Sequence, residues 1–418
     1  MPTDTHGAID AIWRIESPRL IAALTRVVRD VGIAEDLAQD ALVAALEQWP
    51  ESGIPENPGA WLMGTAKHRA IDFFRRNAMA DRKHEGLWRD YNAREQTMPD
   101  LDSSLDDPIG DDLLRLIFIA CHPVLPKEAR LALTLRLLGG LTTDEIARAF
   151  VSSEPTIAQR IVRAKRTLAE KGVPFEIPRG RELNNRLASV LEVIYLIFNE
   201  GYTATAGDDW MRPSLCEEAL RLGRVLAELA PYEPEVHGLV ALMEIQASRS
   251  AARIGPEGEP ILLMDQNRAK WDRLLIQRGL AALERARQLG VEPGPYRVQA
   301  EIAACHARAG DPQQTDWNEI VALYGQLVQI MPSPIIELNR AVAVSMASGP
   351  EKALQIVDGI LGDPRLDNYH LLPSARANFL KKLGRLAEAR IEFERAAALT
   401  RNEQERKLLL QKARECTA

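Results

Sequence analysis

The amino-acid sequence predicts an all-α fold. Apolar residues recur at helical spacing from the beginning, as in Leu20, Leu24, Val27, Val28 and Val31, which places them on one face of a helix. Aromatic residues make up only 5% of the 418 residues, and alternating runs of β-branched residues are scarce. Strands are therefore not expected to build a core, and the length suggests two or three helical domains.

The first domain is expected over residues 8–77. A second helix follows the first, with apolar residues at Leu37, Ala41, Val43, Ala44 and Leu46. A loop is then predicted from Trp49-Pro50 onward, because the next residues include Gly53, Pro55, Pro58 and Gly59. A further helix is expected to begin at residues 60–61 and to continue to about residue 76.

A change of composition marks residues 78–110 as a linker. This stretch is polar, and near its end it is rich in Asp and holds Pro108 and Gly110. A second helical domain is expected over residues 111–172, and Pro174, Pro178 and Gly180 mark its end. Residues 181–418 are again predicted to be helical, with loops near residues 203–209, 255–260 and 293–295.

Weak internal repetition appears in this last domain and is clearest over residues 334–400. Ala353 and Val357 recur as Ala389 and Phe393, 36 residues later. A period of about 34 residues, with a small residue where two helices pack, is typical of tetratricopeptide repeats. Residues 317–332 resemble a degenerate earlier copy, although Ala-rich helical hairpins in general can produce the same pattern.

The charged residues are distributed unevenly, so the net charge of −7 is a poor guide to partners. Residues 60–89 carry seven Lys or Arg and three acids, and residues 126–172 carry nine and five. Each stretch is thus a basic island, and the rest of the chain is strongly acidic. Because salt screens charges beyond about 8 Å, distant acids act little on the islands.

The second island contains a helix-turn-helix pattern over residues 141–168. Thr142 or Thr143 can cap a short first helix, in which Asp144 and Glu145 suit the positive N-terminus. A turn follows at residues 151–153, and Pro155 lies in the first turn of a second helix, where its missing N–H costs nothing. The residues predicted to face inward are Ile146, Ile157, Ile161 and Leu168.

The outer face of this second helix is polar and basic. It presents Thr156, Gln159, Arg160 and Arg163, with Lys165 and Arg166 further along. A recognition helix offers such side chains to base edges in the major groove and to phosphates. A solvated amphipathic helix with a basic face is the plainer interpretation, but the preceding helix and short turn favour DNA binding.

The first island combines aromatic residues with cations over residues 57–76. Aromatic faces can stack on unpaired bases while cations hold the backbone, and a loop can form a pocket for a flipped base. In the plainer interpretation Trp61 and Phe73 belong to the core, and Arg75 and Arg76 end a solvated helix. Both interpretations stay open for this island taken alone.

The sequence gives little reason to expect an enzyme, a metal site or a cofactor. It holds neither a Gly-rich phosphate loop nor HExxH, and its histidines are isolated. Four cysteines stand far apart without a CxxC pair, which fits a reducing cytoplasm better than disulfides or zinc. The longest apolar stretches fall far short of a membrane span, and we expect neither a signal peptide nor a membrane partner.

Taken together, the islands resemble the regions of a bacterial RNA polymerase sigma factor of the extracytoplasmic-function type, over about residues 10–172. Residues 36–49, beginning Asp36-Leu37-Ala38-Gln39-Asp40, look like the helix that binds the polymerase core. Residues 58–62 and 70–76 look like the helix that recognises and melts the −10 promoter element. Residues 141–168 look like the region that reads the −35 element. This resemblance implies polymerase core and promoter DNA as partners.

The resemblance also implies roles for individual residues. Asp36, Gln39 and Asp40 would bind polymerase, and the loop over residues 50–58 would help to hold an extruded base. Residues at the −10 element would be Trp61, Lys67, Arg69, Arg75 and Arg76. Residues at the −35 element would be Thr156, Gln159, Arg160, Arg163, Lys165 and Arg166. The polymerase would supply catalysis and magnesium, so the chain itself needs no catalytic residue.

The C-terminal part is similar to the helical, tetratricopeptide-like extension of one subgroup of these factors. Residues 194–202 look like its start, although a buried helix end stopped by Gly201 is the plainer interpretation and is favoured for this stretch alone. We expect the extension to regulate the factor, either by packing on the DNA-binding domains or by docking a regulatory protein. The remaining alternative is a helix-turn-helix regulator with a partner-docking domain that does not act as a sigma factor.

Overall fold

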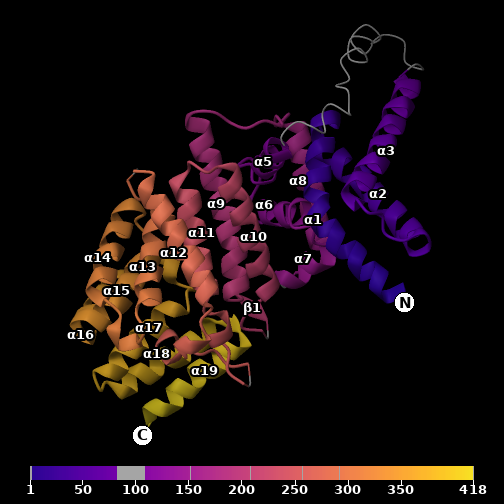
Figure 1. Cartoon of the computed structure of the whole chain (residues 1–418). Coiled ribbons are helices and arrows are strands. Elements are labelled where there is room, and N and C mark those ends of the chain that lie inside the picture. The colour runs from indigo at the N-terminus through magenta and orange to yellow at the C-terminus, as the bar shows by residue number, and fades with distance from the viewer. Residues whose placement is uncertain are drawn as a thin grey trace. The chain divides into compact units, whose positions relative to one another are not determined.

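A computed structural model describes residues 2–81, 109–150, 152–207, 209–256, 258–290 and 292–417. Its contacts divide the chain into unit 1 (Met1–Val193) and unit 2 (Ile194–Ala418), and Figure 1 traces their helices in chain order. Helix α9 (Arg181–Tyr202) contains this division, which falls between residues 193 and 194, whereas the sequence predicts that the extension begins at residue 181. Most of the predicted linker, residues 82–108, lies outside the described residues.

Unit 1 consists of helices, as predicted. Asp30 caps one of them by accepting the N–H groups of Gly32 and Ile33 at 2.7 and 3.0 Å. The buried faces are rich in Ala and Leu, which lets the helices approach closely. Before α9 these helices are α1 (Pro2–Val28), α2 (Val31–Ser52), α3 (Pro58–Asp81), α5 (Ile109–Ala120), α6 (Lys127–Leu137), α7 (Thr143–Ala149) and α8 (Glu154–Glu170).

The loop predicted from Trp49 onward is shorter than expected, because α2 continues through Pro50 to Ser52. Trp49 is 1% exposed and packs edge-to-face on Trp61, with ring centroids 5.2 Å apart. This burial fixes the last turn of the helix although Pro50 lies inside it. Gly53, with φ +84°, ends the helix and donates its N–H to the Trp49 carbonyl.

Unit 2 is built almost entirely of paired helices. They are α10 (Pro213–Leu229), α11 (Pro234–Ala247), α12 (Arg273–Gln288), α13 (Pro295–Arg308), α14 (Trp317–Ile330), α15 (Pro334–Ser348), α16 (Pro350–Ile360), α17 (Leu371–Lys382), α18 (Leu386–Leu399) and α19 (Glu403–Arg414). The prediction of an all-α fold is confirmed. Among the described residues, none of the helices is both long and apolar enough to span a bilayer.

The predicted repeat corresponds to equivalent positions on α16 and α18. Ala353 and Val357 on α16, like Ala389 and Phe393 on α18, are fully buried in one hydrophobic cluster. The small alanines allow close helix packing, and the larger residue one turn later fills the space between helices. Helix α14 falls at the position of the suspected earlier copy.

A short parallel sheet in unit 2 was not predicted. Strand β1 (Ala206–Gly207) pairs with β2 (Arg401–Asn402), and Asn402 is 1% exposed. Its side-chain amide donates to the carbonyls of Ala204 and Asp209, at 3.2 and 2.8 Å. The sheet thus joins the beginning of unit 2 to its last helix.

Gly201 does not stop α9, which continues to Tyr202. A Cβ at Gly201 would lie 2.6 Å from the Cys216 backbone nitrogen and 2.9 Å from the Leu215 Cβ. The glycine is therefore needed because it allows the start of α10 to approach α9 closely. It does not serve as a left-handed residue that ends the helix.

Candidate nucleic-acid interface

Helices α7 and α8 form the predicted helix-turn-helix, and local caps define both helices. Thr142 and Glu145 make a reciprocal capping box at α7, and Ser153 accepts the Thr156 N–H at the start of α8. The four residues predicted to face inward are between 0 and 6% exposed. This packing presents the opposite face of α8 outward.

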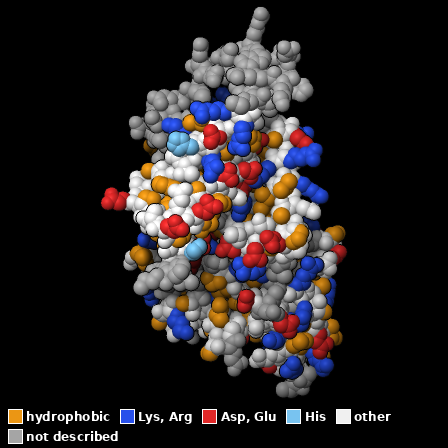
Figure 2. Space-filling view, turned by 90° about the vertical axis from the view of Figure 1, so that its right-hand side faces the viewer, with side chains coloured by type: hydrophobic (Ala, Val, Ile, Leu, Met, Phe, Trp, Pro, Cys, Tyr) orange, Lys and Arg blue, Asp and Glu red, His pale blue; other side chains and the backbone are white. Residues whose placement is uncertain are grey.

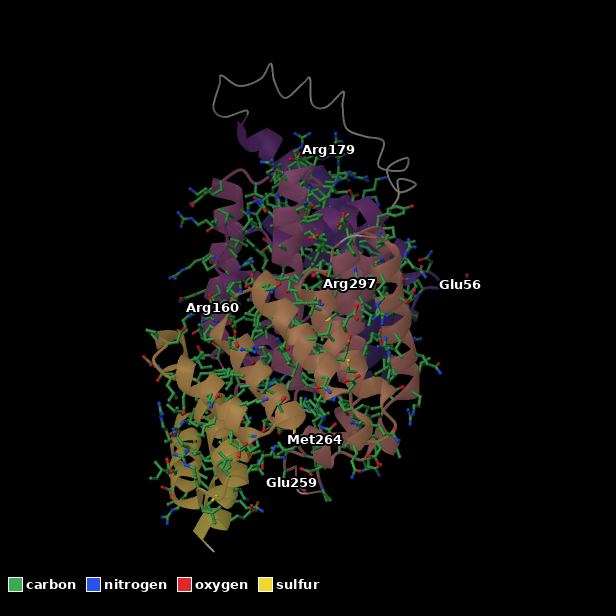
Figure 3. All side chains as sticks on the ribbon, turned by 90° about the vertical axis from the view of Figure 1, so that its left-hand side faces the viewer. Glu56, Arg160, Arg179, Glu259, Met264 and Arg297 are labelled. Atoms are coloured by element: carbon green, nitrogen blue, oxygen red, sulfur yellow. The ribbon has the colours of Figure 1, made fainter. Side chains whose placement is uncertain are left out.

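Most of the predicted recognition residues lie on that outer face. Gln159 and Arg163 are exposed, while Thr156 and Arg160 are partly exposed, and Figure 3 labels Arg160 on the first half of α8. The Thr156 hydroxyl is 2.7 Å from that of Ser153. Arg166, further along, donates to Glu170 at 2.6 Å. The face thus offers amide, hydroxyl and guanidinium groups, the kinds of group that read base edges and bind phosphates.

Lys165 lies elsewhere, because its side chain is directed at helix α2. Its Nζ is 2.5 Å from the Glu35 Oε2 and 3.8 Å from the Asp36 Oδ1, and the side chain is only 18% exposed. The contact with Glu35 is an ion pair without the alignment of a hydrogen bond. In this arrangement Lys165, a predicted DNA-binding residue, adjoins Asp36, a predicted polymerase-binding residue.

Glu35 is the centre of this contact and is 3% exposed. Its Oε1 accepts from the Arg136 Nε at 2.6 Å and from the Gln39 amide at 2.7 Å. A buried carboxylate is stable only when it is paired in this way. Sequence reasoning missed Glu35, although an acid next to the buried positions Ala34 and Ala38 is a signal that could have found it.

Further contacts join the same two groups of helices within unit 1. Arg14 of α1 pairs with Glu145 at 2.5 Å, and Arg26 pairs with Asp112 of α5 at 3.1 Å. Gly140, with φ +65°, lies against the α1 backbone, where a Cβ would be 3.2 Å from the Arg14 Cα. The helix-turn-helix is therefore packed on α1 and α2 through several contacts besides the Glu35 pair.

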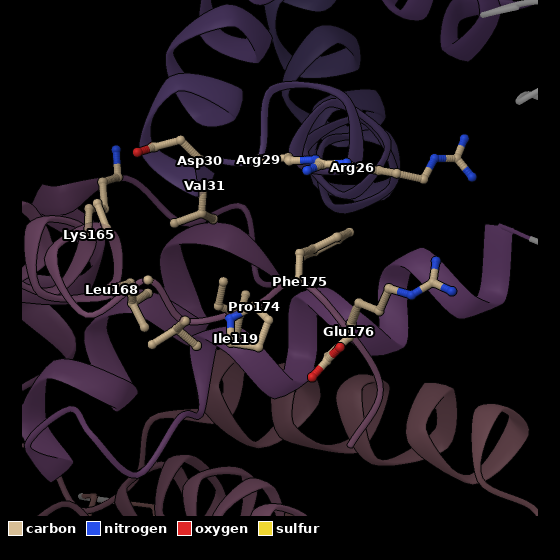
Figure 4. A pocket seen from close by; sticks show the side chains of 14 residues that line it. Arg26, Arg29, Asp30, Val31, Ile119, Lys165, Leu168, Pro174, Phe175 and Glu176 are labelled. Atoms are coloured by element: carbon tan, nitrogen blue, oxygen red, sulfur yellow. The ribbon is translucent and has the colours of Figure 1, made fainter. Parts of the chain in front are cut away.

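A cavity of about 730 Å³ lies along this seam, and Figure 4 shows the residues that line it. Arg29, whose φ is +57°, is exposed beside it, and Phe175 and Leu168 contribute apolar walls. Two other cations of the lining, Arg26 and Lys165, are already in ion pairs with acids of unit 1. Arg115, which also lines the cavity, shares Asp112 with Arg26.

The three predicted polymerase-binding residues all lie on α2. Asp36 and Asp40 are exposed, whereas Gln39 is partly buried and donates its amide to Glu35. Both carboxylates are thus accessible, although Asp36 also lies 3.8 Å from the Lys165 Nζ of α8. Gln39 has an intramolecular role that its sequence position did not indicate.

The predicted −10 residues lie along α3. Trp61 is partly buried and packs edge-to-face on Trp49, so part of its surface belongs to the core. Arg69, Arg75 and Arg76 are exposed, and Lys67 is partly exposed. Arg75 is 4.0 Å from Asp72, which holds it only weakly. On the face of the molecule in Figure 2, Lys and Arg are interspersed with acids.

Within the part of the chain that the structure describes, no group of three or more His, Cys, Asp or Glu residues could hold a metal ion. All four cysteines are free, and three of them are buried. Burial raises the pKa of the Cys121 thiol to about 11, so it stays protonated near neutral pH. These cysteines act as small packing residues.

Three family models match separate parts of the chain. Sigma-70 region 2 matches residues 12–79, and Sigma-70 region 4 matches residues 115–168. A family of unknown function, DUF6596, matches residues 186–287. The first two matches cover α1 to α3 and α5 to α8, the helices that carry the predicted interface residues.

Several curated proteins are similar to the chain. An uncharacterized protein of Rhizobium meliloti (strain 1021) is 44% identical over 405 residues, which cover 96% of this chain and 94% of the relative. The probable ECF RNA polymerase sigma factor SigI of Mycobacterium tuberculosis (strain CDC 1551 / Oshkosh) is 26% identical over 175 residues, 41% of this chain and 58% of SigI. ECF RNA polymerase sigma factor SigK of Mycobacterium sp. (strain KMS) is 28% identical over 158 residues, 37% of this chain and 77% of SigK.

Proposed function

Since the chain belongs to the extracytoplasmic-function type of RNA polymerase sigma factors, we propose that it directs polymerase core to specific promoters and that its C-terminal extension regulates this activity. The capped α7–α8 pair, with an outward face of polar and basic side chains, is the observation that carries the proposal. The exposed cations of α3 support it, because an opened strand needs phosphate contacts near aromatic rings.

In this proposal three surfaces of unit 1 have different binding roles. Asp36, Gln39 and Asp40 on α2 dock on polymerase. Residues of α3 hold the opened −10 strand, namely Trp61, Lys67, Arg69, Arg75 and Arg76. Residues of α8 read the −35 major groove and its phosphates, namely Thr156, Gln159, Arg160, Arg163, Lys165 and Arg166. Polymerase supplies the chemistry, and this chain supplies the choice of promoter.

The ion pairs of Glu35 support a closed form of the factor. While Lys165 is bound to Glu35, it cannot contact a phosphate, and α8 lies beside the polymerase-binding residue Asp36. Full engagement of DNA and polymerase then requires α8 to separate from α2. A factor of this kind is active only when its partners favour the separated form.

Arg160→Ala is expected to weaken discrimination between the correct upstream element and a mutated one by about 1–3 kcal/mol, because it removes a base-edge contact. In the polymerase complex, where this proposal has α8 separated from α2, Lys165→Ala is expected mainly to lower the salt dependence of binding, by about one ion, because it removes a phosphate contact. Binding titrations of the polymerase complex on both DNAs at several salt concentrations measure both quantities. Equal effects of the two changes on all DNA sequences would contradict the assigned roles.

Removal of the extension tests its regulatory role. A chain ending at Val193 keeps Arg186 and Ser189 of α9, which donate to the carbonyls of Phe118 and Cys121 at 3.1 and 2.6 Å. We expect this chain to fold and to show changed run-off transcription with polymerase core. A chain ending at Pro178 lacks both contacts and is expected to be less stable.

Transcription by the truncated chain is compared with that by the full chain on promoters identified by genome-wide binding. If the full chain initiates at none of these promoters, the sigma factor role fails. If it initiates and truncation at Val193 leaves the activity and its promoter preference unchanged, only the regulatory role of the extension fails.

A further inference from the structure

Three arginines of unit 2 surround two aromatic rings. The guanidinium carbons of Arg249 and Arg253 lie 5.7 and 3.5 Å from the ring centroid of Tyr202. Those of Arg249 and Arg268 lie 5.9 and 4.8 Å from the Trp271 ring. Arg249 therefore lies between the other two. We call Arg249, Arg253 and Arg268 the arginine cluster.

No acid among the described residues forms an ion pair with the arginine cluster. Arg253 donates to the Tyr202 carbonyl and to the Thr203 hydroxyl. Arg268 donates to carbonyls of residues 306 and 309 and to the Thr315 hydroxyl. These acceptors are neutral, so they satisfy N–H groups and leave the positive charges in place.

Charges outside the arginine cluster offset only part of its positive charge. Asp311 favours the charged form of Arg268, but its carboxylate accepts the Gln313 N–H at 2.8 Å. Arg249 follows the C-cap of α11, where the last carbonyls of the helix favour a cation. Arg253 and Arg268 are each 7% exposed. Like charges held together at such burial destabilise one another.

The neighbouring residue His306 shows the effect of this positive charge. His306 is 7% exposed, and burial, Arg249 and Arg268 together lower its pKa to about 4. Its Nδ1 lacks a hydrogen-bond partner, as do the buried Nε of Arg249, the Nε of Arg268 and the Trp271 Nε1. The arginine and tryptophan nitrogens among these are N–H donors, and buried donors without a partner in one place favour an acceptor from outside the protein.

Arg249 is the accessible member of the arginine cluster. It is partly exposed, and the turn that follows it reaches the surface at Ala251. Its guanidinium makes ring contacts but donates no hydrogen bond to another described residue. A guanidinium with free donors, reinforced by two neighbouring charges, matches the charge and planar geometry of an oxyanion.

We propose that Arg249, supported by Arg253 and Arg268, binds the oxyanion group of a small molecule, a carboxylate or a phosphate. The aromatic rings around the arginine cluster hold the three guanidiniums in place and keep water partly excluded, which strengthens the attraction. Such a site makes the extension the part of the factor that senses a small anionic metabolite. This last step rests on the proposed regulatory role, whereas the binding itself does not.

The test measures thermal unfolding of the full chain, and its tryptophan fluorescence, during titration with inorganic phosphate or with malonate at constant ionic strength. We expect saturable stabilisation by one of the two, because a ligand that binds only the folded state raises its stability. The more effective anion identifies the source as a phosphate or a carboxylate. Chloride at the same ionic strength measures the unspecific effect of salt.

Arg249→Gln is the decisive variant, and Arg285→Gln, at an exposed site on α12, is its matched control. We expect Arg249→Gln to weaken binding about tenfold or more and to leave unfolding without ligand unchanged or at a higher temperature, since it relieves repulsion. The control should bind as the wild type does. Absence of saturable binding, or equal binding by Arg249→Gln, overturns the proposal whatever the extension does in transcription.

Discussion

Replacement of Glu35 by Gln is expected to lower the free energy of unfolding of unit 1 by about 3 kcal/mol. The carboxylate contacts Arg136 at 2.6 Å and Lys165 at 2.5 Å, and these cations are only 21 and 18% exposed. A glutamine leaves both cations without a counter-charge in a poorly solvated place. Urea unfolding measures the change, and amide hydrogen exchange of α2 and α8 assigns it to this contact.

Glu47→Gln is the matched control, because Glu47 is on the same helix and exposed, and it should change stability by less than about 0.5 kcal/mol. The double change Glu35→Gln with Lys165→Met should recover part of the loss, since it removes both partners of one pair. Equal stability of Glu35→Gln and Glu47→Gln would show that the pair does not hold α8 to α2.

If the pair does hold them, Glu35→Gln should also expose α8 and increase DNA binding by the free factor.

Gly201→Ala is expected to destabilise unit 2 by about 2 kcal/mol. The added Cβ would lie 2.6 Å from the Cys216 nitrogen and 3.0 Å from the Arg212 carbonyl oxygen. Both atoms belong to the backbone at the start of α10, so the helices must move apart. The higher helix propensity of alanine offsets about 1 kcal/mol of this cost, and thermal unfolding measures the net effect.

Gly359→Ala provides the opposite case on α16. No atom lies within 4 Å of the added Cβ, and the position is exposed. The substitution should therefore stabilise the protein, by about 0.4–1 kcal/mol. A destabilisation of similar size by both substitutions would indicate that helix packing at Gly201 is not the cause.

The elements that the sequence predicts well are those with local signals. The helix-turn-helix follows from Thr142 and Pro155 together with the helical spacing of the buried isoleucines, all within thirty residues. The α16–α18 repeat follows from the small and large residues at one spacing. Each of these signals acts between neighbours in the chain, so the sequence contains it directly.

The features that sequence reasoning missed depend on residues far apart. Glu35 is a buried centre because Arg136 of α6 and Lys165 of α8 both reach it, and Gln39 donates to the same carboxylate from within α2. The predicted end of α2 was wrong because the burial of Trp49 outweighs the local preference of Pro50. The arginine cluster is likewise assembled from separate turns around Trp271. The helical periodicity of the sequence does not indicate which residues from distant segments come into contact.

The pairing of β1 with β2 determines when unit 2 can be completed during synthesis. A ribosome releases the chain from its N-terminus, and domains generally fold as they emerge. Unit 1 has all its residues by Val193, when more than half of the chain is still to be made. Ala206 and Gly207 must wait for Arg401 and Asn402, which follow them only much later in the chain. During synthesis there is therefore a period in which unit 1, which carries the proposed promoter-binding residues, is complete while unit 2 is not.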